Sequence, residues 1–319
     1  MSAIAYVAGD AGARLTLQSV ADCLPGTWLA LDANDNAQEW RRGLHSRNIA
    51  LLMCGTSDSS AGRALEQSAR ISANALAIPS IVIEDFPGNY YAAPGGKPRL
   101  VVVGAEVDAR RVREKDGPLD VTVCPCVRYD PLRRRLAELR SNRSAAENAI
   151  LWVGQPETAD SLATLNGLLP ALRDVEIWFR AHPRDTGYGS GAYTRLPIED
   201  LTRWPLHECL TRRPRLVVTQ FSSVAIEAGF WGIPSLHALI PDLGGRALSE
   251  KKGYAIPPWC EAGAAFLVVQ RAEIELVVQR ALYADAAREA VMQSFDRYFQ
   301  VHTQGAPVLI DVLYNQGLL

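Results

Sequence analysis

The chain has 319 residues, of which 48% are hydrophobic and 21% are charged, and its formal net charge is −2 at pH 7. This composition excludes a disordered or fibrous polymer, and the length suggests two globular domains of about 150 residues each. The balanced charge provides no global basic field for nucleic acid, and the five histidines and six cysteines are too scattered to predict a metal cluster.

The first residues lack the features of a targeting signal. Met1–Gly9 has no basic segment ahead of a long apolar one, and no apolar run approaches the ~20 residues of a bilayer span. The cysteines lack disulfide spacing, and Cys54 and Cys209 lie in or beside apolar segments where free thiols are commonly buried. We therefore expect a cytoplasmic protein without a transmembrane segment.

The first half alternates strands with helices. Short β-branched runs predict strands at Ile4–Ala8, Trp28–Leu31, Ile49–Cys54, Ser80–Glu84, Leu100–Val103 and Val121–Cys124. Helical periodicity marks Arg14–Cys23 and Ala61–Ala75, and glycine or proline separates the elements. This alternation predicts an α/β fold with a doubly wound parallel sheet, a Rossmann-like domain over residues 1–140.

A basic segment follows this domain. Leu132–Asn148, which contains Arg133–Arg135 and Arg143, is interpreted as an amphipathic helix that leads into an exposed connector. It could contact an anionic acceptor or a membrane surface, although charge runs are more often solvated faces. Peripheral membrane contact is therefore an open alternative.

The second half repeats the alternation. It predicts strands at Ala149–Val153, Val175–Arg180, Leu216–Thr219, Ser235–Ala238 and Ala265–Val269, and helices at Thr158–Leu172, Ser222–Trp231 and Glu273–Tyr283. We expect a second Rossmann-like domain, residues 141–285, that faces the first across a cleft. The last segments, Ala286–His302 and Pro307–Tyr314, predict helices within 286–319 that pack back across the hinge.

In open parallel sheets, ligands bind beyond the carboxyl ends of the strands. After the first strand, Gly9–Arg14 does not match G-x-G-x-x-G, so a nicotinamide site is unsupported. Gly9 and Arg14 are candidate substrate contacts. An ordinary strand-to-helix turn explains the same glycines equally well.

The loops after the third and fourth strands carry polar candidates. Gly55, Thr56 and Ser57 lie at a helix start that could hold an anion or a sugar hydroxyl, and N-capping explains only one or two residues of this run. Glu84 and Asp85 are the leading acid/base candidates in this half. A solvated loop carboxylate is an equally good interpretation of each.

A histidine flanked by arginines follows the strand at 175–180. Pro183 ends this strand, so His182 would converge on the cleft together with Arg180 and Arg184. This combination favours a phosphate, because guanidinium groups match phosphate oxygens and an imidazole can donate a proton to a departing one.

The strand at 216–219 leads into a hydroxyl turn. Gln220, Ser222 and Ser223 precede a helix whose N-terminal N–H groups predict a diphosphate pocket, and the two serines could cap that helix at the same time. Glu227 lies one turn further on, where its carboxylate could bind ribose hydroxyls.

These motifs resemble those of a known group. Arg180–Pro183 (Arg-Ala-His-Pro) and Gln220–Ser223 (Gln-Phe-Ser-Ser), followed by Glu227–Pro234, are similar to the His-Pro and Ser-Ser motifs of GT-B-fold glycosyltransferases. Bacterial sialyl- and polysialyltransferases and CDP-glycerol glycerophosphotransferases carry such motifs. The last stretch also resembles the nucleotide-sugar site of UDP-N-acetylglucosamine 2-epimerases. The resemblance is close in the second half only.

The resemblance implies a GT-B fold in which residues 1–140 would bind the acceptor and residues 141–285 the nucleotide donor. It also implies roles for single residues. His182 would contact the nucleotide phosphates and assist the leaving group, the Ser222–Ser223 pair would bind the diphosphate, and Glu227 the ribose. Gly154 and Gln155 would line the nucleotide pocket. The partners would be a nucleotide-activated sugar, as substrate rather than cofactor, and an unidentified acceptor of cell-surface polysaccharide biosynthesis.

The sequence departs from the family pattern in places. Arg180 stands where the transferases often have lysine, and Ser222–Val224 replaces the Ser-Gly-Gly of the epimerases, which weakens the epimerase interpretation. The Asp/Glu-Asp-Gly base motif of some sialyltransferases is missing. Asp10, Asp58 and Asp85 therefore compete for the role of the base that deprotonates the acceptor.

We expect a metal-independent glycosyltransferase with no cofactor. Asp32–Asp35 does not match an Asp-x-Asp metal motif, so the helix dipole, His182 and Arg180 would replace a divalent cation. Two alternatives stay open: a nucleotide-sugar epimerase or hydrolase with the same donor site, and a noncatalytic GT-B-like binding protein that lacks the base.

Overall fold

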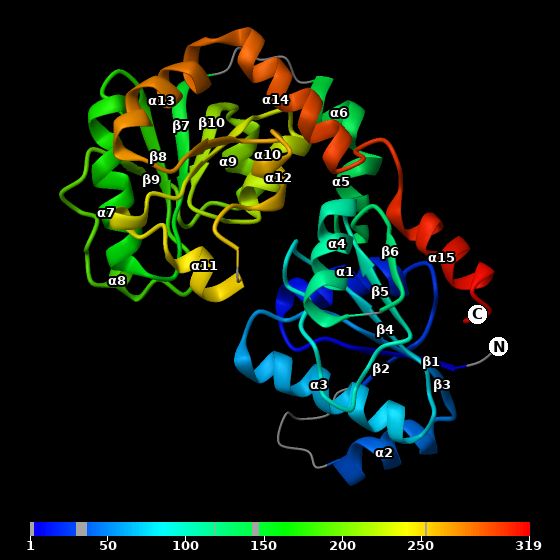
Figure 1. Ribbon diagram of the computed structural model, residues 1–319. Helices are drawn as coiled ribbons and strands as arrows, with labels where there is room; N and C mark the ends of the chain where they lie inside the picture. The colour runs from blue at the N-terminus through cyan, green and yellow to red at the C-terminus, as the bar shows by residue number, and fades with distance from the viewer. Residues whose placement is uncertain (1–2, 30–36, 118, 142–146, 253) are drawn as a thin grey trace. The chain divides into compact units, whose positions relative to one another are not determined.

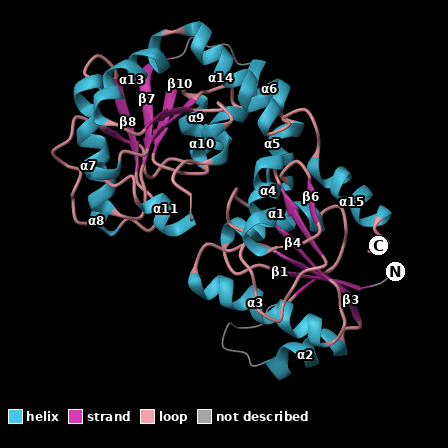
Figure 2. Ribbon diagram, viewed as in Figure 1, coloured by secondary structure: helices cyan, strands magenta, loops and turns pink. Residues whose placement is uncertain are grey.

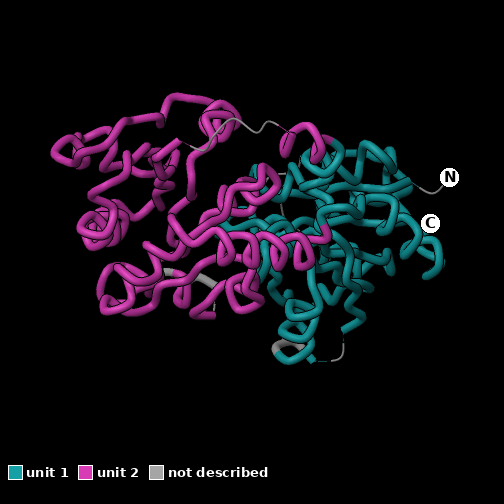
Figure 3. Tube along the Cα trace, turned by 90° about the horizontal axis from the view of Figure 1, so that it is seen from above, with its two compact units in different colours: residues 1–134, 301–319 teal, residues 135–300 magenta. Residues whose placement is uncertain are grey.

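The computed structural model describes residues 3–29, 37–117, 119–141, 147–252 and 254–319 (Figure 1). The predicted features at Asp32–Asp35 and Arg143 lie outside these residues. Helices surround parallel strands throughout (Figure 2). The chain forms two compact units: unit 1 contains Met1–Arg134 and Val301–Leu319, and unit 2 contains Arg135–Gln300 (Figure 3).

Unit 1 is built on a six-stranded parallel sheet with the order β2-β1-β3-β4-β5-β6. Its strands are β1 (Ala3–Val7), β2 (Thr27–Trp28), β3 (Ile49–Cys54), β4 (Ser80–Ile83), β5 (Leu100–Val103) and β6 (Val121–Val123). Its helices are α1 (Ala11–Ala21), α2 (Ala37–Ser46), α3 (Ser60–Ala75), α4 (Glu106–Asp116), η1 (Val127–Tyr129), α5 (Asp130–Arg134) and α15 (Gly305–Asn315).

The strands of unit 1 are apolar on both sides because both faces of the sheet are covered. Leu52 and Cys54 of β3 pack into a core with side chains from α2, α3 and α4. Leu51 and Met53, which point to the opposite face, pack with α1 and α15. The continuous apolar run in β3 thus follows from helices on both faces.

Unit 2 contains a second six-stranded parallel sheet, with the order β12-β11-β10-β7-β8-β9. Its strands are β7 (Glu147–Val153), β8 (Glu176–Arg180), β9 (Glu199–Asp200), β10 (Pro214–Thr219), β11 (Ser235–Ala238) and β12 (Phe266–Val268). Its helices are α6 (Leu136–Ser141), α7 (Thr158–Leu168), η2 (Leu169–Leu172), α8 (Thr186–Gly189), α9 (Leu206–Thr211), α10 (Val224–Phe230), η3 (Pro241–Leu243), α11 (Ala247–Lys252), α12 (Pro258–Glu261), η4 (Arg271–Glu273), α13 (Ile274–Tyr283) and α14 (Asp285–Tyr298).

The sheet of unit 2 is also covered on both faces. Ile177 and Phe179 of β8 pack into the large core that α7, η2 and α13 share. Trp178 points to the other face, where the guanidinium of Arg212 lies 3.9 Å from its ring centroid. In Figure 2, α7 and α10 accordingly lie on opposite sides of the strands.

The predicted fold class, two doubly wound α/β units, is confirmed. The strands β3, β5 and β11 have the predicted bounds, whereas the two-residue strand β9 was not predicted. The helix and connector predicted over Leu132–Asn148 are confirmed in part: residues 132–134 and 136–141 are helical in α5 and α6, with a break at Arg135, and Glu147 and Asn148 already belong to β7. The predicted cleft and the packing of helices across a hinge stay predictions.

Two further expectations concern thiols and membranes. Cys54 and Cys209 are free and buried, as predicted. In the described part of the chain, every helix is too short or too polar to cross a bilayer.

A buried ion pair joins α5 to α15 within unit 1. Asp130 is 1% exposed and accepts hydrogen bonds from the backbone N–H groups of Gly305 (2.7 Å) and Ala306 (2.8 Å) at the start of α15. Arg133 donates to the same carboxylate at 2.8 Å. Arg133 was predicted to lie on a solvated face, but this partner allows it to be buried.

Asp130→Ala should destabilise the protein by about 3–5 kcal/mol, because it leaves the buried guanidinium of Arg133 without its carboxylate. Urea unfolding measures this change. Glu138→Ala is the matched control, because Glu138 pairs with Arg135 on the solvent-exposed surface. This variant should unfold at the same urea concentration as the wild type. Equal midpoints for the wild type and Asp130→Ala would contradict this assignment.

Candidate functional site

Each sheet has a topological switch point, where successive strands of the chain are added first on one side of a central strand and then on its other side. In unit 1 the switch lies between β1 and β3, and in unit 2 it lies between β7 and β10. Open α/β sheets bind ligands at the carboxyl ends of such strands. The predicted site residues of Gly9–Asp10, Gly55–Asp58, Gly154–Gln155 and Gln220–Ser223 all follow these four strands.

A buried carboxylate connects the two switch-point loops of unit 1. Glu66 of α3 is 0% exposed and accepts hydrogen bonds from the Gly9 N–H (3.1 Å), the Ser57 N–H (2.9 Å) and the Ser57 hydroxyl (2.6 Å). The Tyr91 hydroxyl also donates to it. Burial raises the pKa of Glu66, and these donors oppose that rise. Glu66 therefore fixes the loops after β1 and β3 against each other.

Sequence reasoning missed Glu66 because it lies in the middle of a helix. A usable signal exists: Gly62, Glu66, Ala69 and Ala73 form the buried stripe of α3, and a carboxylate within such a stripe needs partners. The contact also requires a close approach, since a Cβ on Gly9 would lie 2.1 Å from the Cα of Gly62.

Asp10 and Asp58 are already engaged. One oxygen of Asp10 accepts from the Ala13 N–H (3.0 Å) and caps α1, and the other accepts from the Asp58 N–H (2.6 Å). The Asp58 side chain is 40% exposed and lies 3.4 Å from the Arg63 guanidinium. Both carboxylates thus have structural or solvated surroundings.

Asp85 has different surroundings. It is 5% exposed, and its Oδ1 accepts from the Thr56 hydroxyl (2.6 Å) and the Asn89 amide (2.9 Å). Its Oδ2 points toward α1, where a Cβ on Gly12 would lie 2.7 Å away. Burial raises the pKa of Asp85, and the neighbouring Arg128 partly offsets that rise. Asp85 therefore has a buried carboxylate that is oriented through its Oδ1, with Oδ2 directed toward α1.

Glu84 occupies the opposite face of the sheet, because successive residues alternate after β4. One of its oxygens accepts from the Tyr90 N–H (3.1 Å), and the other is buried without a hydrogen-bond partner among the described residues. Burial, followed by the nearby carboxylate of Asp108, raises the pKa of Glu84 well above its usual range. These surroundings therefore favour the protonated form of the Glu84 carboxyl group.

Arg14 does not join these groups. Its guanidinium lies over the Trp28 ring of β2, 4.8 Å from the ring centroid. Unit 1 thus brings together Gly9, the Gly55–Asp58 loop and Asp85, whereas the binding role of Arg14 stays a prediction.

In unit 2, His182 is half-buried after β8. Its Nδ1 accepts a hydrogen bond from the Arg184 N–H (3.1 Å), so the neutral ring carries its proton on Nε2 and can donate it. Arg180 instead donates to the carbonyl oxygens of Thr202 (3.1 Å) and Trp204 (3.0 Å) in the loop after β9. Pro183 is exposed. The phosphate contacts of these residues stay predictions.

Gly154 and Gln155 connect β7 to its neighbours. The Gly154 N–H donates to the carbonyl of Arg180 (3.0 Å), and the Gln155 N–H donates to the Ser161 hydroxyl (2.9 Å). The Gln155 side chain is 4% exposed and donates to the Thr219 hydroxyl at 3.2 Å. These bonds orient Gln155 toward the β7–β10 switch point.

The serine turn after β10 differs in detail from the expected capping. Ser223 is the N-cap residue of α10, but its hydroxyl makes no capping bond. The Ser222 hydroxyl instead accepts from the Val224 N–H at 3.2 Å. Glu227 lies half-buried in α10, and its predicted ribose contact stays a prediction.

A buried histidine that the sequence did not single out lies beside this turn. His237 of β11 is 0% exposed, and its Nδ1 lies 2.7 Å from the carbonyl oxygen of Gln220. The indole N–H of Trp259 donates to Nε2 at 3.1 Å. Burial lowers the pKa of His237 to about 4, so the ring is neutral near pH 7.

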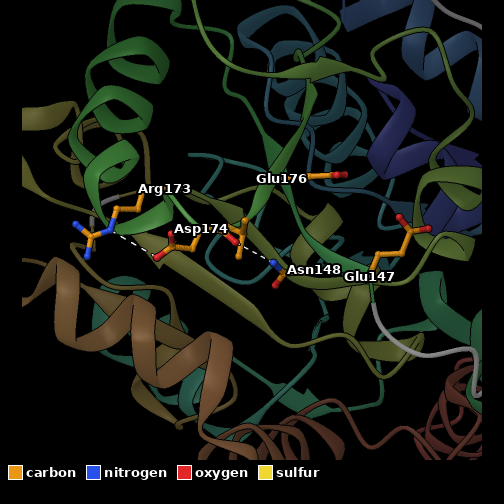
Figure 4. Close-up of a pocket in the computed structure, with 6 residues that line it drawn as sticks. Glu147, Asn148, Arg173, Asp174 and Glu176 are labelled. Carbon is orange, nitrogen blue, oxygen red and sulfur yellow. Dashed lines mark hydrogen bonds and ion pairs between the residues drawn. The ribbon is translucent and has the colours of Figure 1, made fainter.

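A hollow of about 550 Å³ lies at the opposite edge of the same sheet (Figure 4). It is lined by the first residues of β7 and β8 and by Arg173–Val175, where Asn148 donates to the Asp174 carbonyl (2.8 Å). Because it lies at the amino ends of the strands and its charged side chains are exposed, we do not assign it to the site.

The comparisons with known proteins concern the fold. No family model and no curated protein matches the sequence. The UDP-GlcNAc 2-epimerase of Methanocaldococcus jannaschii, in complex with UDP-GlcNAc and UDP, is similar with a TM-score of 0.64 at 13% identity over 98% of this chain and 99% of its own.

Two other solved structures give the same result. MurG of Acinetobacter baumannii has a TM-score of 0.60 at 15% identity over 99% of this chain and 100% of its own. The glycosyltransferase of kitacinnamycin has a TM-score of 0.61 at 16% identity, with 98% of each chain covered. At such identities the similarity shows the fold alone, and the chain has the two-domain α/β fold of GT-B type.

Acidification should destabilise the wild type through His237. Its pKa is about 4 when folded against 6.5 when unfolded, so its contribution is complete above pH 6.5 and is lost as the pH falls. Between pH 7.5 and 5.0 we expect the free energy of unfolding to fall by about 2 kcal/mol more than in His237→Asn. The carboxyl groups with raised pKa values are present in both proteins, so their effects on the pH dependence cancel in the comparison. Parallel curves of unfolding free energy against pH, measured by urea unfolding, would contradict this prediction.

Proposed function

We propose that this protein is an enzyme that binds a nucleotide-activated sugar at the carboxyl edge of the unit 2 sheet and transfers the glycosyl group to an acceptor. The observation that carries the proposal is the serine turn: the Ser223 hydroxyl starts α10 without a capping bond and is available to a phosphate. The similarity of the fold to a glycosyltransferase and to an epimerase bound to UDP-GlcNAc supports the same substrate class.

The proposed chemistry requires donors around the leaving phosphate. Cleavage of the glycosidic bond places positive charge on the sugar and negative charge on the phosphate, and one oriented donor can lower such a barrier by ~2.7–4 kcal/mol. The Ser223 hydroxyl and the Nε2–H of His182 follow β10 and β8, the two neighbours of β7. In this proposal, they stabilise the departing diphosphate without a resident metal or cofactor.

Asp85 is the proposed base. Its Oδ1 is held by Thr56 and Asn89, whereas both oxygens of Asp10 have backbone donors and Asp58 is exposed. A raised pKa makes a carboxylate a better proton acceptor at neutral pH, provided that it is still ionised. Asp85 thus combines orientation, burial and basicity.

A nucleotide-sugar epimerase or hydrolase is the second candidate. Such an enzyme needs acid and base groups in unit 1 rather than an acceptor, and the buried carboxyl groups of Glu66, Glu84, Asp85 and Asp108 provide a set from which they could come. The solved epimerase with this fold supports the alternative as much as the transferases support the first.

Ser223→Ala should weaken nucleotide binding by about 10-fold or more, because a hydrogen bond to a charged phosphate is worth about 1.5–3 kcal/mol. The variant loses no hydrogen bond within α10, so its own melting temperature should not change. Thermal shifts with UDP, CMP, CDP, GDP and dTDP select the ligand, and calorimetry measures its affinity. Ser294→Ala, in α14, is the control; wild-type affinity in Ser223→Ala would exclude this turn as the phosphate site.

Asp85→Asn should lower the turnover of a nucleotide sugar by about 10²- to 10⁴-fold while nucleotide affinity stays unchanged. Release of free nucleotide is the assay, first without and then with candidate acceptors. Release without an acceptor supports the hydrolase, and conversion of the nucleotide sugar into its epimer without net release of nucleotide supports the epimerase. Asp58→Asn is the control and should be nearly as active as the wild type. Full activity of Asp85→Asn would remove Asp85 from the mechanism.

A further inference from the structure

We infer that His237 is a positioning residue for nucleotide binding: by holding the Gln220 carbonyl, it sets the conformation of the Ser222–Ser223 turn. The inference rests on the proposed function and adds to it a residue of β11 that needs no contact with the ligand. His237 pairs in register with Thr219, the last residue of β10, and the turn begins one residue later.

The two partners of His237 determine its tautomer. The indole of Trp259 can only donate, so Nε2 of His237 must be unprotonated to accept it. The carbonyl of Gln220 can only accept, so Nδ1 must carry the proton. A single neutral tautomer therefore satisfies both bonds, and the direction of the Nδ1–H bond to the turn is fixed.

The imidazole is itself held rigidly. Its ring meets the Trp259 ring edge-on, with centroids 5.5 Å apart and planes at 69°, and Trp259 is 1% exposed. Phe299 packs on Trp259 and on Phe295, which in turn contacts Phe230 at the end of α10. One aromatic cluster thus contacts both His237, which binds the start of the serine turn, and Phe230, at the end of the helix that follows the turn.

Gln220 is fixed at its side chain as well as at its carbonyl. Its amide donates to the Thr164 hydroxyl of α7 at 2.8 Å, and Thr164 in turn donates to the carbonyl of Leu243. The remaining freedom at the start of the turn is rotation of the Gln220–Phe221 peptide, and the bond from His237 restricts this rotation. Losing that bond should alter the direction of the Ser222 and Ser223 groups.

A burial argument supports a specific role. A neutral imidazole in a fully buried position loses its hydration, whereas an apolar ring would fill the same space without that loss. The two hydrogen bonds compensate the imidazole, and one of them is directed at the turn. The geometry therefore explains why this position of β11 carries a histidine rather than an apolar residue.

The test compares nucleotide affinity in His237→Asn, His237→Phe and the wild type, by calorimetry with whichever of UDP, CMP, CDP, GDP and dTDP binds the wild type best. The amide of asparagine can donate near the Nδ1 position, whereas phenylalanine keeps a ring without a donor. We expect His237→Phe to weaken affinity by about 10-fold and His237→Asn by less than about 3-fold. Leu282→Ala is the matched control for lost stability, because Leu282 is buried beside Arg215 at the other end of β10.

The outcomes separate this inference from the proposed function. A wild type that binds none of the nucleotides overturns the proposed function and the inference with it. Nucleotide binding by the wild type and equally by His237→Phe overturns the inference alone. Equal loss in His237→Asn and His237→Phe, or an equal loss in Leu282→Ala, also overturns it, because affinity would then follow packing or stability.

His237→Leu keeps the test decisive if His237→Phe does not fold. Leucine is smaller than phenylalanine, and its apolar side chain cannot donate a hydrogen bond to the Gln220 carbonyl. We expect a loss of about 10-fold in affinity, with the apo protein still folded by circular dichroism. Wild-type affinity in this variant would overturn the inference.

Discussion

The loops at a topological switch cannot satisfy their backbone groups through the sheet, and this constraint organises both units. Beyond the last paired residue, a strand loses its neighbours just where the chain turns away, yet buried N–H and C=O groups still require partners. Unit 1 meets this requirement with Glu66, which accepts from Gly9 and Ser57. Unit 2 meets it with His237, which donates to Gln220. A buried polar side chain from a neighbouring element thus shapes each candidate site.

The two side chains act with opposite polarity. Glu66 accepts hydrogen bonds from N–H and O–H donors of the unit 1 loops, and the buried carboxylate of Asp85 lies in the same region. His237 donates a hydrogen bond to the carbonyl oxygen of Gln220. In the turn that follows, the Ser223 hydroxyl makes no capping bond, and the start of α10 is half-buried. This contrast agrees with the proposed division of roles, in which acid/base groups belong to unit 1 and an anion is bound by unit 2.

The same geometry explains why transfer and epimerisation are hard to separate on this fold. Both reactions would use the same donor groups after β8 and β10, and they differ in what the unit 1 carboxyl groups meet. Asp85 and Glu84 are adjacent in the chain but lie on opposite faces of the sheet, so they cannot serve the same side of one substrate.

Much of the architecture follows from local sequence. The apolar, β-branched runs of β3, β5 and β11 predict strands with the observed bounds, because strands covered on both faces must be apolar throughout. The motifs also lie at the carboxyl ends of strands, as predicted, and a glycine directly follows β3 and β7. Local periodicity predicted a helix after Leu132, but it did not predict the break between α5 and α6 or the burial of Asp130 and Arg133, because the N–H of Gly305 that binds Asp130 lies 175 residues away in the chain.

Only the tertiary structure decided which polar residues hold the site. The buried stripe of α3 marks Glu66 as a carboxylate that needs partners, but it does not name them, and the partners of Glu66 and His237 lie 9 to 57 and 17 to 22 residues away. The same holds for Asp85, whose orientation depends on Thr56 of another loop. Sequence by itself determined most of the strands, their order of appearance and the motif positions, because these depend on nearest neighbours. The two-residue strand β9 was missed, and the hydrogen bonds between distant loops exist only once the sheet of their unit has formed.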